Sequence, residues 1–453
     1  MDRVARAIEV AQKSRHLNAL ITETFDLAQR QCKNHIAEGR STFNVVVKDN
    51  FAVRDVPMTC ASRMLANYKA PYTATVVERL VDNGGCVIGK ANMDEFAMGS
   101  TNVDSYFGPA KNPKTPIAQM DGDFFVAGGS SGGCAVAISE GFADVAIGSD
   151  TGGSTRNPAS FNGVCGFKPS YGLLSRYGLV PLVNSFDSPS LFTRDVNDCM
   201  KYFDQILGRD EKDCTTLNLK DKNIYSAIES LQHVKVGVPM EFRRAKMSED
   251  CRRIWHKAID SLASAGAQVK DVKLPHTPYS VVCYHILNQS DVFSNMSRYD
   301  GIEFGHRENQ RTSFNELMAN SRTKALNDVV RKRIFAGNYF NLEENKGRYF
   351  LQAAKIRRLI QSDFAAAFQD VDVLILPSTN HSAPTISQVR ARSAEENQNE
   401  DFFTQSANMC GLPAISIPFG ECSNGLPLGV QLIGDYLNDW TCMKVGSLFQ
   451  GLR

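Results

Sequence analysis

Two short glycine-serine turns constrain this 453-residue chain more than any other feature of its sequence. The first reads GGSSGG over residues 128–133, and the second reads DTGGS over residues 150–154. The turns border apolar runs, so each is expected as a tight connection between a buried strand and a helix. Glycine permits backbone conformations that other residues avoid, and serine brings a hydroxyl group to the same place. The stretch therefore indicates rigid, hydroxyl-bearing turns, not a flexible linker.

The GGSSGG turn alone is compatible with three interpretations. A glycine-rich loop at a helix start binds phosphate through free N–H groups, but no Lys-Ser/Thr follows it and no spaced GxGxxG is present. Residues 128–132 also satisfy G-x-S-x-G, the nucleophile elbow of α/β hydrolases, with Ser130 as the nucleophile. The third interpretation is a structural turn with no chemistry.

The DTGGS turn adds a second group of functional atoms. Successive N–H groups around Gly152 and Gly153 form a concave set of donors that suits a developing oxyanion, and Ser154 is placed to attack a carbonyl held there. None of the eight histidines lies in or next to either turn, so the base must come from elsewhere. Lys48 ends the apolar run FNVVVK, and burial lowers the pKa of a lysine until it can accept a proton. The alternative is that Lys48 is a solvated strand end.

Apolar runs alternate with helical patterns along most of the chain, which predicts an α/β fold. Strands are expected near residues 43–47, 86–89, 143–150, 163–170, 233–239, 267–275, 371–377, 414–418 and 429–434. Helices are expected near residues 73–82, 133–141, 249–265, 284–295, 325–337 and 342–368, and from 439 onward. Strands that are apolar almost throughout indicate a mixed, mostly buried sheet covered by helices on both faces.

The same patterns predict one large domain over residues 1–453. Its core segments are expected at 43–190 and 370–453, with a more variable helical excursion at about 190–370. The polar stretch from about 208 to 230 is expected on the surface.

Composition limits the class of protein. Fifty Lys and Arg against 49 Asp and Glu give a net charge of +1, which does not favour a surface that binds nucleic acid unaided. The twelve cysteines include no CxxC pair, so we expect buried free thiols in a reducing compartment and no metal site. No apolar run is long enough to span a membrane, and residues 1–20 lack the apolar core of a secretory signal. Those residues are expected as a surface helix, with an organellar targeting helix as the alternative.

The two turns and their surroundings together match one family pattern. Residues 128–172 contain GGSSGG, then SDTGGSTRNP, then GFKPSYG, in that order. This arrangement resembles the amidase signature family, whose catalytic triad is Ser-Ser-Lys. The resemblance implies that Ser154 is the nucleophile, that Ser130 is a relay serine preceded by a cis peptide bond, and that Lys48 is the base.

The resemblance also implies roles around the triad. The N–H groups of the second turn, from Thr151 through Gly152 and Gly153 to Ser154, would hold the oxyanion. Ser131 and Asp150 would orient Lys48 and the two turns. Arg156 would pair with Asp150, or would be a surface cation.

Further stretches are similar to one branch of the family, the glutaminase subunits of tRNA-dependent amidotransferases. They are KANMDEFAMGSTNVDSYFGPAKNP, GFKPSYGLLSRYGLVPLVNSFD, SRYDGIEFG, RKRIFAG and ANMCGLPAISIPFG. This similarity implies an amidase that frees ammonia from glutamine within a carbon-nitrogen ligase, which converts Glu-tRNA(Gln) to Gln-tRNA(Gln). A stand-alone amidase that acts on other small amides is the alternative. A non-catalytic scaffold is disfavoured because all three triad residues are retained.

An α-amino acid substrate needs a cation for its carboxylate and an anion for its ammonium group. The resemblance assigns Arg333 to the carboxylate and Asp401 to the ammonium group, and gives Tyr284 a contact with the substrate. Arg331 is the alternative to Arg333, because the register of the RKRI motif is open. Without the resemblance, these charged residues would be interpreted as solvated surface groups.

Partners and compartment follow from the same resemblance. The expected partners are a B-type transamidase subunit, which contacts most of the tRNA, and a small linker subunit. No cofactor is expected in this chain, and ATP and Mg²⁺ are expected on the companion subunit. The mitochondrial matrix is the expected location, with a bacterial cytoplasm as the alternative.

Overall fold

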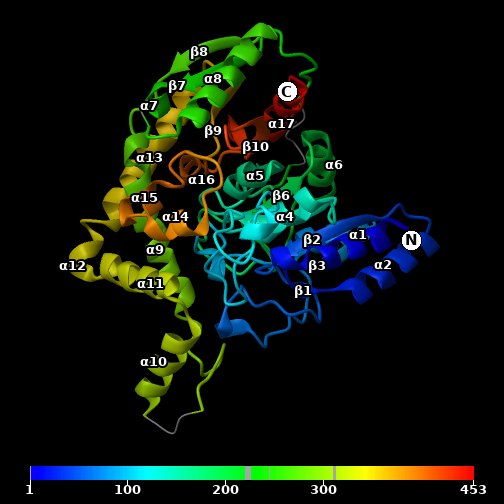
Figure 1. The fold of residues 1–453 in the computed structure, drawn as a ribbon. Helices are drawn as coiled ribbons and strands as arrows, with labels where there is room; N and C mark the ends of the chain where they lie inside the picture. Colours follow the sequence, from blue (N-terminus) through cyan, green and yellow to red (C-terminus); the bar gives the residue numbers. More distant parts are fainter. Residues whose placement is uncertain (1, 220–225, 244, 310–312, 453) are drawn as a thin grey trace.

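A computed structural model describes residues 2–219, 226–243, 245–309 and 313–452 of the chain. One eleven-stranded sheet runs through these residues in the order β1-β3-β2-β4-β6-β5-β10-β11-β9-β7-β8 (Figure 1). The strands are β1 (Leu20–Glu23), β2 (Phe43–Lys48), β3 (Gly85–Ala91), β4 (Val145–Asp150), β5 (Cys165–Lys168), β6 (Ser188–Thr193), β7 (Lys235–Pro239), β8 (Gln268–Val272), β9 (Val373–Pro377), β10 (Ala414–Glu421) and β11 (Pro427–Gly434).

The sheet is mixed. Strand β2 pairs in parallel with β3 and β4, and β7 pairs in parallel with β8 and β9. The pairs from β4 through β6, β5, β10 and β11 to β9 are antiparallel, as is β1 with β3. The predicted α/β fold with a mixed, mostly buried sheet is therefore confirmed.

Strand β2 illustrates why the strands are apolar throughout. Successive side chains of a strand point to opposite faces of the sheet. Val45 and Val47 belong to one buried cluster, whereas Val46 belongs to a second cluster. Both faces of the sheet are thus covered, as the continuous apolar runs indicate.

Helices cover the two faces. One cluster includes residues from α1 (Asp2–Lys13), α2 (Phe25–Ala37), α4 (Gly132–Glu140) and α5 (Arg156–Asn162). The larger cluster includes residues from α3 (Thr75–Asp82), α6 (Val196–Ile206), α7 (Met240–Arg243), α8 (Glu249–Ser264), α9 (Ser280–Met296), α13 (Phe350–Ala367) and α17 (Asp439–Gln450). The short helices α14 (Ile386–Ala391), α15 (Ala394–Asn399) and α16 (Gln405–Cys410) lie between β9 and β10 in the chain.

Three helices form an arm that projects from the body of the molecule (Figure 1). They are α10 (Phe314–Ala325), α11 (Asp328–Asn341) and α12 (Glu343–Lys346). Asn327 caps α11, because its side-chain oxygen accepts a hydrogen bond from the N–H of Val330. Helix α11 packs along α9, so the arm is joined to the body.

Several elements were not predicted from the sequence. These are β1, β6, α5 and α6. The described part of the polar stretch, residues 208–219 and 226–230, contains no helix or strand, while residues 220–225 lie outside the described residues. All twelve cysteines are free, and all but Cys214 and Cys410 are buried. Within the described residues, no helix has the length and apolar character needed to cross a membrane.

Two glycines of the arm provide a matched test of its packing against α9. A Cβ added at Gly337 would lie 1.9 Å from the backbone oxygen of Gln289 and 2.7 Å from Cβ of Phe293. A Cβ added at Gly347 would meet nothing within 4 Å, and the φ of Gly347 is −63°. We expect Gly337→Ala to lower the melting temperature, because overpacking costs about 1–3 kcal/mol and outweighs the gain of about 1 kcal/mol in helix propensity.

The control substitution Gly347→Ala should leave the melting temperature unchanged or raise it slightly, since its backbone already suits alanine. Thermal unfolding followed by circular dichroism measures both variants. A Gly337→Ala variant as stable as the wild type would contradict the close approach of α11 to α9.

Candidate active site

Lys48 lies at the carboxyl end of β2, in the centre of the sheet, and is fully buried. Its Nζ donates to Oγ of Ser130 at 2.8 Å and to Oγ of Ser149 at 3.0 Å. The carbonyl oxygen of Ser149 is a third, longer contact at 3.4 Å. Because β2 and β4 are parallel neighbours, their carboxyl ends bring Lys48 and Ser149 together.

The surroundings of Lys48 favour its neutral amine. Burial lowers the pKa of Lys48 to about 8, and the more distant carboxylates of Asp94, Asp150 and Asp187 only partly oppose that shift. A neutral amine has two hydrogens and one lone pair. With both hydrogens directed to the two oxygens of Ser149, the lone pair is left for the hydroxyl of Ser130. This arrangement suits a base that takes a proton from Ser130.

The first turn places Ser130 directly before α4. The peptide bond between Gly129 and Ser130 is cis, and Ser130 is fully buried. A Cβ at Gly129 would lie 2.1 Å from Oδ2 of Asp94, so only glycine fits there. The N–H of Asp94 donates to the carbonyl oxygen of Ser130, and Ser131 Oγ donates to the carbonyl oxygen of Ser149.

The second turn is built around the carboxylate of Asp150. It accepts hydrogen bonds from the N–H groups of Gly153 (2.8 Å) and Thr155 (3.1 Å). Arg156 binds both carboxylate oxygens, at 3.1 and 3.0 Å, and both side chains are fully buried. Burial alone would raise the pKa of Asp150, but the guanidinium of Arg156 and the amide of Asn408 bring it to about 2.

The N–H groups of this turn do not all remain available. The N–H of Gly153 is already donated to Asp150. No described residue accepts a hydrogen bond from the N–H of Gly152 or of Ser154. Thr151 is held by its side chain, which donates to Asp187 at 2.7 Å. The donors open to an oxyanion are therefore those of Gly152 and Ser154, flanking Gly153.

Ser154 differs from the other two serines in its exposure. Ser130 and Ser131 are fully buried, whereas Ser154 is partly exposed. No described residue forms a hydrogen bond with the Ser154 side chain. Its hydroxyl is thus open to an incoming molecule, as a nucleophile requires.

Tyr284 and Arg333 approach the second turn from the helices α9 and α11. A Cβ at Gly152 would lie 2.4 Å from Oη of Tyr284, which places this buried phenol against the turn. Tyr284 Oη accepts from Nδ2 of Asn288 at 3.2 Å, and Nη1 of Arg333 donates to Oδ1 of Asn288 at 3.4 Å. Arg331 is instead paired with Asp328 on its own helix. The structure therefore connects Arg333 to the turn and leaves Arg331 outside.

Asp401 approaches the same turn from the segment before α16. A Cβ at Gly153 would lie 3.4 Å from Oδ1 of Asp401 and 2.2 Å from Oγ1 of Thr404. Burial raises the pKa of Asp401 to about 8, and the carboxylates of Glu400 and Asp150 add to the shift, while Arg333 opposes it. A cationic group bound beside Asp401 would return it to the ionised form.

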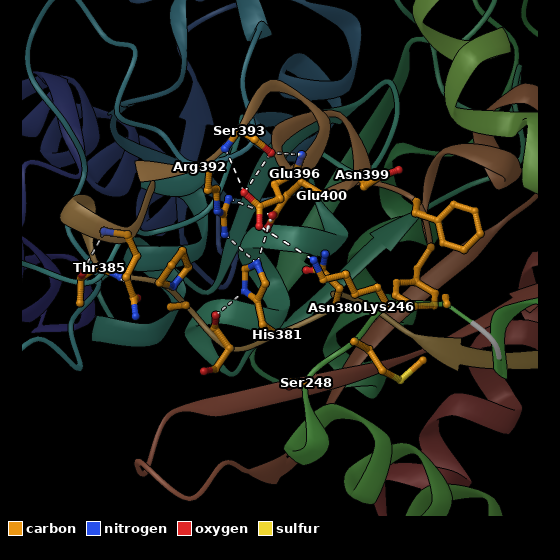
Figure 2. A pocket seen from close by; sticks show the side chains of 18 of the residues that line it. Lys246, Ser248, Asn380, His381, Thr385, Arg392, Ser393, Glu396, Asn399 and Glu400 are labelled. Carbon is orange, nitrogen blue, oxygen red and sulfur yellow. Dashed lines mark hydrogen bonds and ion pairs between the residues drawn. The ribbon is translucent and has the colours of Figure 1, made fainter. Parts of the chain in front are cut away.

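A pocket of about 940 Å³ lies on the other side of this segment. Figure 2 shows His381, Arg392 and Glu400 meeting in its wall. Arg392 Nη1 lies 2.9 Å and His381 Nε2 lies 3.1 Å from Oε2 of the buried Glu400. Burial raises the pKa of Glu400, but these two partners lower it further than burial raises it. No triad residue lines the pocket.

Sequence reasoning missed several residues that the site uses. Ser149 contacts Lys48, Thr404 donates to the carbonyl oxygen of Gly152 at 2.6 Å, and Asn408 donates to the carbonyl oxygen of Asp150 at 2.9 Å. Asp94 and Asp187 are the other two. All five are polar side chains within or beside apolar stretches, which is the signal that could have identified them.

Comparisons with known proteins agree with this geometry. The family model described as Amidase matches residues 3–443. The A-type subunit of the mitochondrial glutamyl-tRNA(Gln) amidotransferase of Aedes aegypti is 45% identical over 452 residues, covering 97% of this chain and 91% of that protein. The human protein of the same name is 42% identical over 470 residues, covering 98% and 89%. The crystal structure of the A-type subunit of glutamyl-tRNA(Gln) amidotransferase from Thermotoga maritima has a TM-score of 0.80 at 34% identity, covering 98% and 90%.

The buried pair of Asp150 and Arg156 supports a stability prediction. Replacing Arg156 by methionine leaves a buried carboxylate without its charge partner. We expect Arg156→Met to cost about 3–5 kcal/mol of unfolding free energy, the usual loss when one member of a buried pair is removed. Urea denaturation measures the loss.

The matched control is Arg243→Met. Arg243 pairs with Asp271, and both side chains are almost half exposed. Exposed pairs contribute about 1 kcal/mol or less, so this variant should remain close to the wild type. Equal losses in the two variants would show that the burial of the Asp150 pair has no special weight.

Proposed function

This chain belongs to the amidase family, and on that premise we propose that it is the glutaminase subunit of a tRNA-dependent amidotransferase. It hydrolyses glutamine and supplies ammonia for the conversion of Glu-tRNA(Gln) to Gln-tRNA(Gln). The observation that carries the proposal is the grouping of Lys48, Ser130 and the DTGGS turn with the charged pair Arg333 and Asp401. Identity of 42–45% to proteins named as the A-type subunit of this enzyme supports the same function.

In the proposed reaction, the hydroxyl oxygen of Ser154 attacks the side-chain amide carbon of glutamine. Ser130 takes the proton of Ser154 while its own proton passes to the neutral amine of Lys48, 2.8 Å away. The carbonyl oxygen becomes an oxyanion, which the free N–H groups beside Gly153 stabilise.

Collapse of this intermediate breaks the carbon-nitrogen bond. The proton held by Lys48 returns through Ser130 to the departing nitrogen, which leaves as ammonia. Water then attacks the acyl-enzyme by the reverse proton path and releases glutamate. The buried contact between Lys48 and Ser130 supports this relay, because no solvent separates the two groups.

Recognition of glutamine is assigned to three side chains around the second turn. Arg333 binds the α-carboxylate, Asp401 binds the α-ammonium group, and Tyr284 contacts the chain between them. Paired charges in a partly buried site discriminate strongly against amides that lack them. The positions of Tyr284 at Gly152 and of Asp401 at Gly153 support this assignment.

The proposed assembly follows the names of the relatives. A transamidase subunit of the B type carries ATP, Mg²⁺ and most of the tRNA contact, and a small linker subunit completes the complex. This chain needs no cofactor for the reaction above. The mitochondrial names of the relatives support a location in the mitochondrion, in the matrix.

Release of ammonia from glutamine tests the function directly. The purified complex of this chain with its companion subunits should release ammonia, and Ser154→Ala should reduce kcat at least about 10³-fold, since no other group replaces the nucleophile. Ser130→Ala and Lys48→Ala should be similarly impaired, because each interrupts the proton path.

Residual activities decide between the possible nucleophiles. Full activity of Ser154→Ala together with an inactive Ser130→Ala would favour the nucleophile elbow at Ser130. A wild-type protein that hydrolyses butyramide but not glutamine would be a stand-alone amidase. Thermal unfolding of each variant serves as the control for folding.

The pH dependence separates the base from the substrate-binding acid. Lys48 acts as a neutral amine and Asp401 as a carboxylate, and burial brings both pKa values to about 8. Acidification below pH 8 therefore protonates both groups and lowers kcat/KM. We expect log kcat/KM for glutamine to fall with a slope that approaches 2 per pH unit, and that for butyramide with a slope of 1.

Asp401→Asn provides the matched control. It should lower kcat/KM for glutamine and reduce its slope to 1, while the profile for butyramide stays unchanged. Equal slopes for the two amides in the wild type would mean that Asp401 does not bind the ammonium group.

A further inference from the structure

Glu95 is a buried carboxyl group that the proposed reaction does not use. It follows Asp94 in the loop after β3, and the residue is 2% exposed. Its Oε1 accepts a hydrogen bond from Oγ of Ser62, and its Oε2 accepts one from the backbone N–H of Asn327 at 2.8 Å. Burying a carboxyl group is costly unless its partners compensate, so its presence calls for a specific reason.

The partners of Glu95 lie at the junction of two arm helices. Ser62 Oγ is also 3.3 Å from the carbonyl oxygen of Ala325, the last residue of α10. Asn327 is the N-cap residue of α11. Its side chain reaches the carbonyl oxygen of Asp104 at 3.4 Å, and that same oxygen accepts the N–H of Glu95. One carboxylate thus connects the start of α11 to the body.

The loop that carries Glu95 is part of the active-site surroundings. The N–H of the preceding residue, Asp94, donates to the carbonyl oxygen of Ser130. The contact of Glu95 with Asn327 therefore joins α11 to the segment that packs directly against the relay serine. In Figure 1 the arm projects away from the sheet, so few other contacts fix its position.

Helix α11 carries the arginine proposed to bind glutamine. Arg333 is six residues after Asn327, or roughly 9 Å along the axis at 1.5 Å per residue. Towards its middle, α11 is held by the close approach of Gly337 to α9. Arg333 lies between these two fixed points, so its distance from Asn288 and Tyr284 depends on both.

We propose that Glu95 is a positioning residue for glutamine: it fixes the start of α11 so that Arg333 faces the α-carboxylate of the substrate. This inference rests on the proposed function for its substrate, but not for the contact itself. Glu95 touches neither the substrate nor the triad. Its loss should therefore weaken glutamine binding and leave the chemistry of amide hydrolysis intact.

Two substitutions of Asn327 isolate the contact. Both Asn327→Pro and Asn327→Ala remove the side-chain cap, but only proline also removes the N–H that donates to Glu95. The φ of Asn327 is −71°, and Leu326 is extended at φ −113° and ψ 135°, so the backbone already suits proline. We expect Asn327→Pro to raise KM for glutamine at least tenfold above that of Asn327→Ala. The kcat/KM for butyramide should agree within twofold in both.

Substitutions of Glu95 complete the test. Glu95→Ala should raise KM for glutamine to the same extent, and adding Asn327→Pro to it should have no further effect, because the two changes remove one interaction. Glu95→Gln retains an acceptor oxygen and should stay within threefold of the wild-type KM. Equal KM values for Asn327→Pro and Asn327→Ala, or a parallel loss of butyramide hydrolysis, would overturn the proposal.

Hydrogen exchange tests the contact whatever the enzyme hydrolyses. In Glu95→Ala the amides of the first turns of α11 should exchange at least tenfold faster, while those of α5 remain unchanged. Unchanged exchange in α11 would overturn the proposal. A wild-type protein that shows this difference but does not hydrolyse glutamine would refute the proposed function and retain the role of Glu95 in placing α11.

Discussion

The buried ion pair of Asp150 and Arg156 is the interaction on which the active site depends. Asp150 ends a central strand and binds two N–H groups of the turn that follows it. Arg156 extends from that carboxylate to the carbonyl oxygen of Thr404 and to the side chains of Asn408 and Gln431, all more than 240 residues away in sequence. The turn that bears Ser154 is therefore fixed from both ends of the chain. Without this pair, neither the nucleophile nor the N–H groups would have a defined position.

The same degree of burial has opposite consequences for Asp150 and Lys48. Asp150 contacts a guanidinium, so its charge is compensated and its pKa is about 2. Lys48 contacts only neutral hydroxyl and carbonyl oxygens, so burial removes its charge and brings its pKa to about 8. Lys90, also fully buried, contacts the carboxylate of Asp49 at 3.0 Å. The chemistry of this site thus depends on which buried lysine is left without a carboxylate partner, because only an unpaired lysine can serve as a base near neutral pH.

The sequence was sufficient for elements whose signal is local. The strands β2, β4, β9 and β11 are continuous apolar runs, and they were predicted because burial on both faces requires such runs. Strand β1 is only four residues long, and β6 begins with Ser-Pro-Ser, so neither has a distinctive pattern. The triad could be assigned only by resemblance, since Lys48 and Ser130 are 82 residues apart and their contact depends on the order of strands. The choice between Arg331 and Arg333 needed the structure, because only the side-chain direction on α11 shows which one reaches Asn288.

The division of labour within the fold explains how hydrolysis and substrate choice can vary independently. The three triad residues come from β2, the start of α4 and the turn after β4, all on one half of the sheet. The three side chains assigned to glutamine come from α9, α11 and the segment before α16, which reach the turn from outside it. A change in those outer elements alters the groups that meet the substrate without moving the contact between Lys48 and Ser130. Glu95 is the exception, because a single buried carboxylate in the inner loop sets the position of an outer helix. Substrate choice in this chain therefore depends on a residue that lies beside the chemistry and contacts neither the substrate nor the reacting atoms.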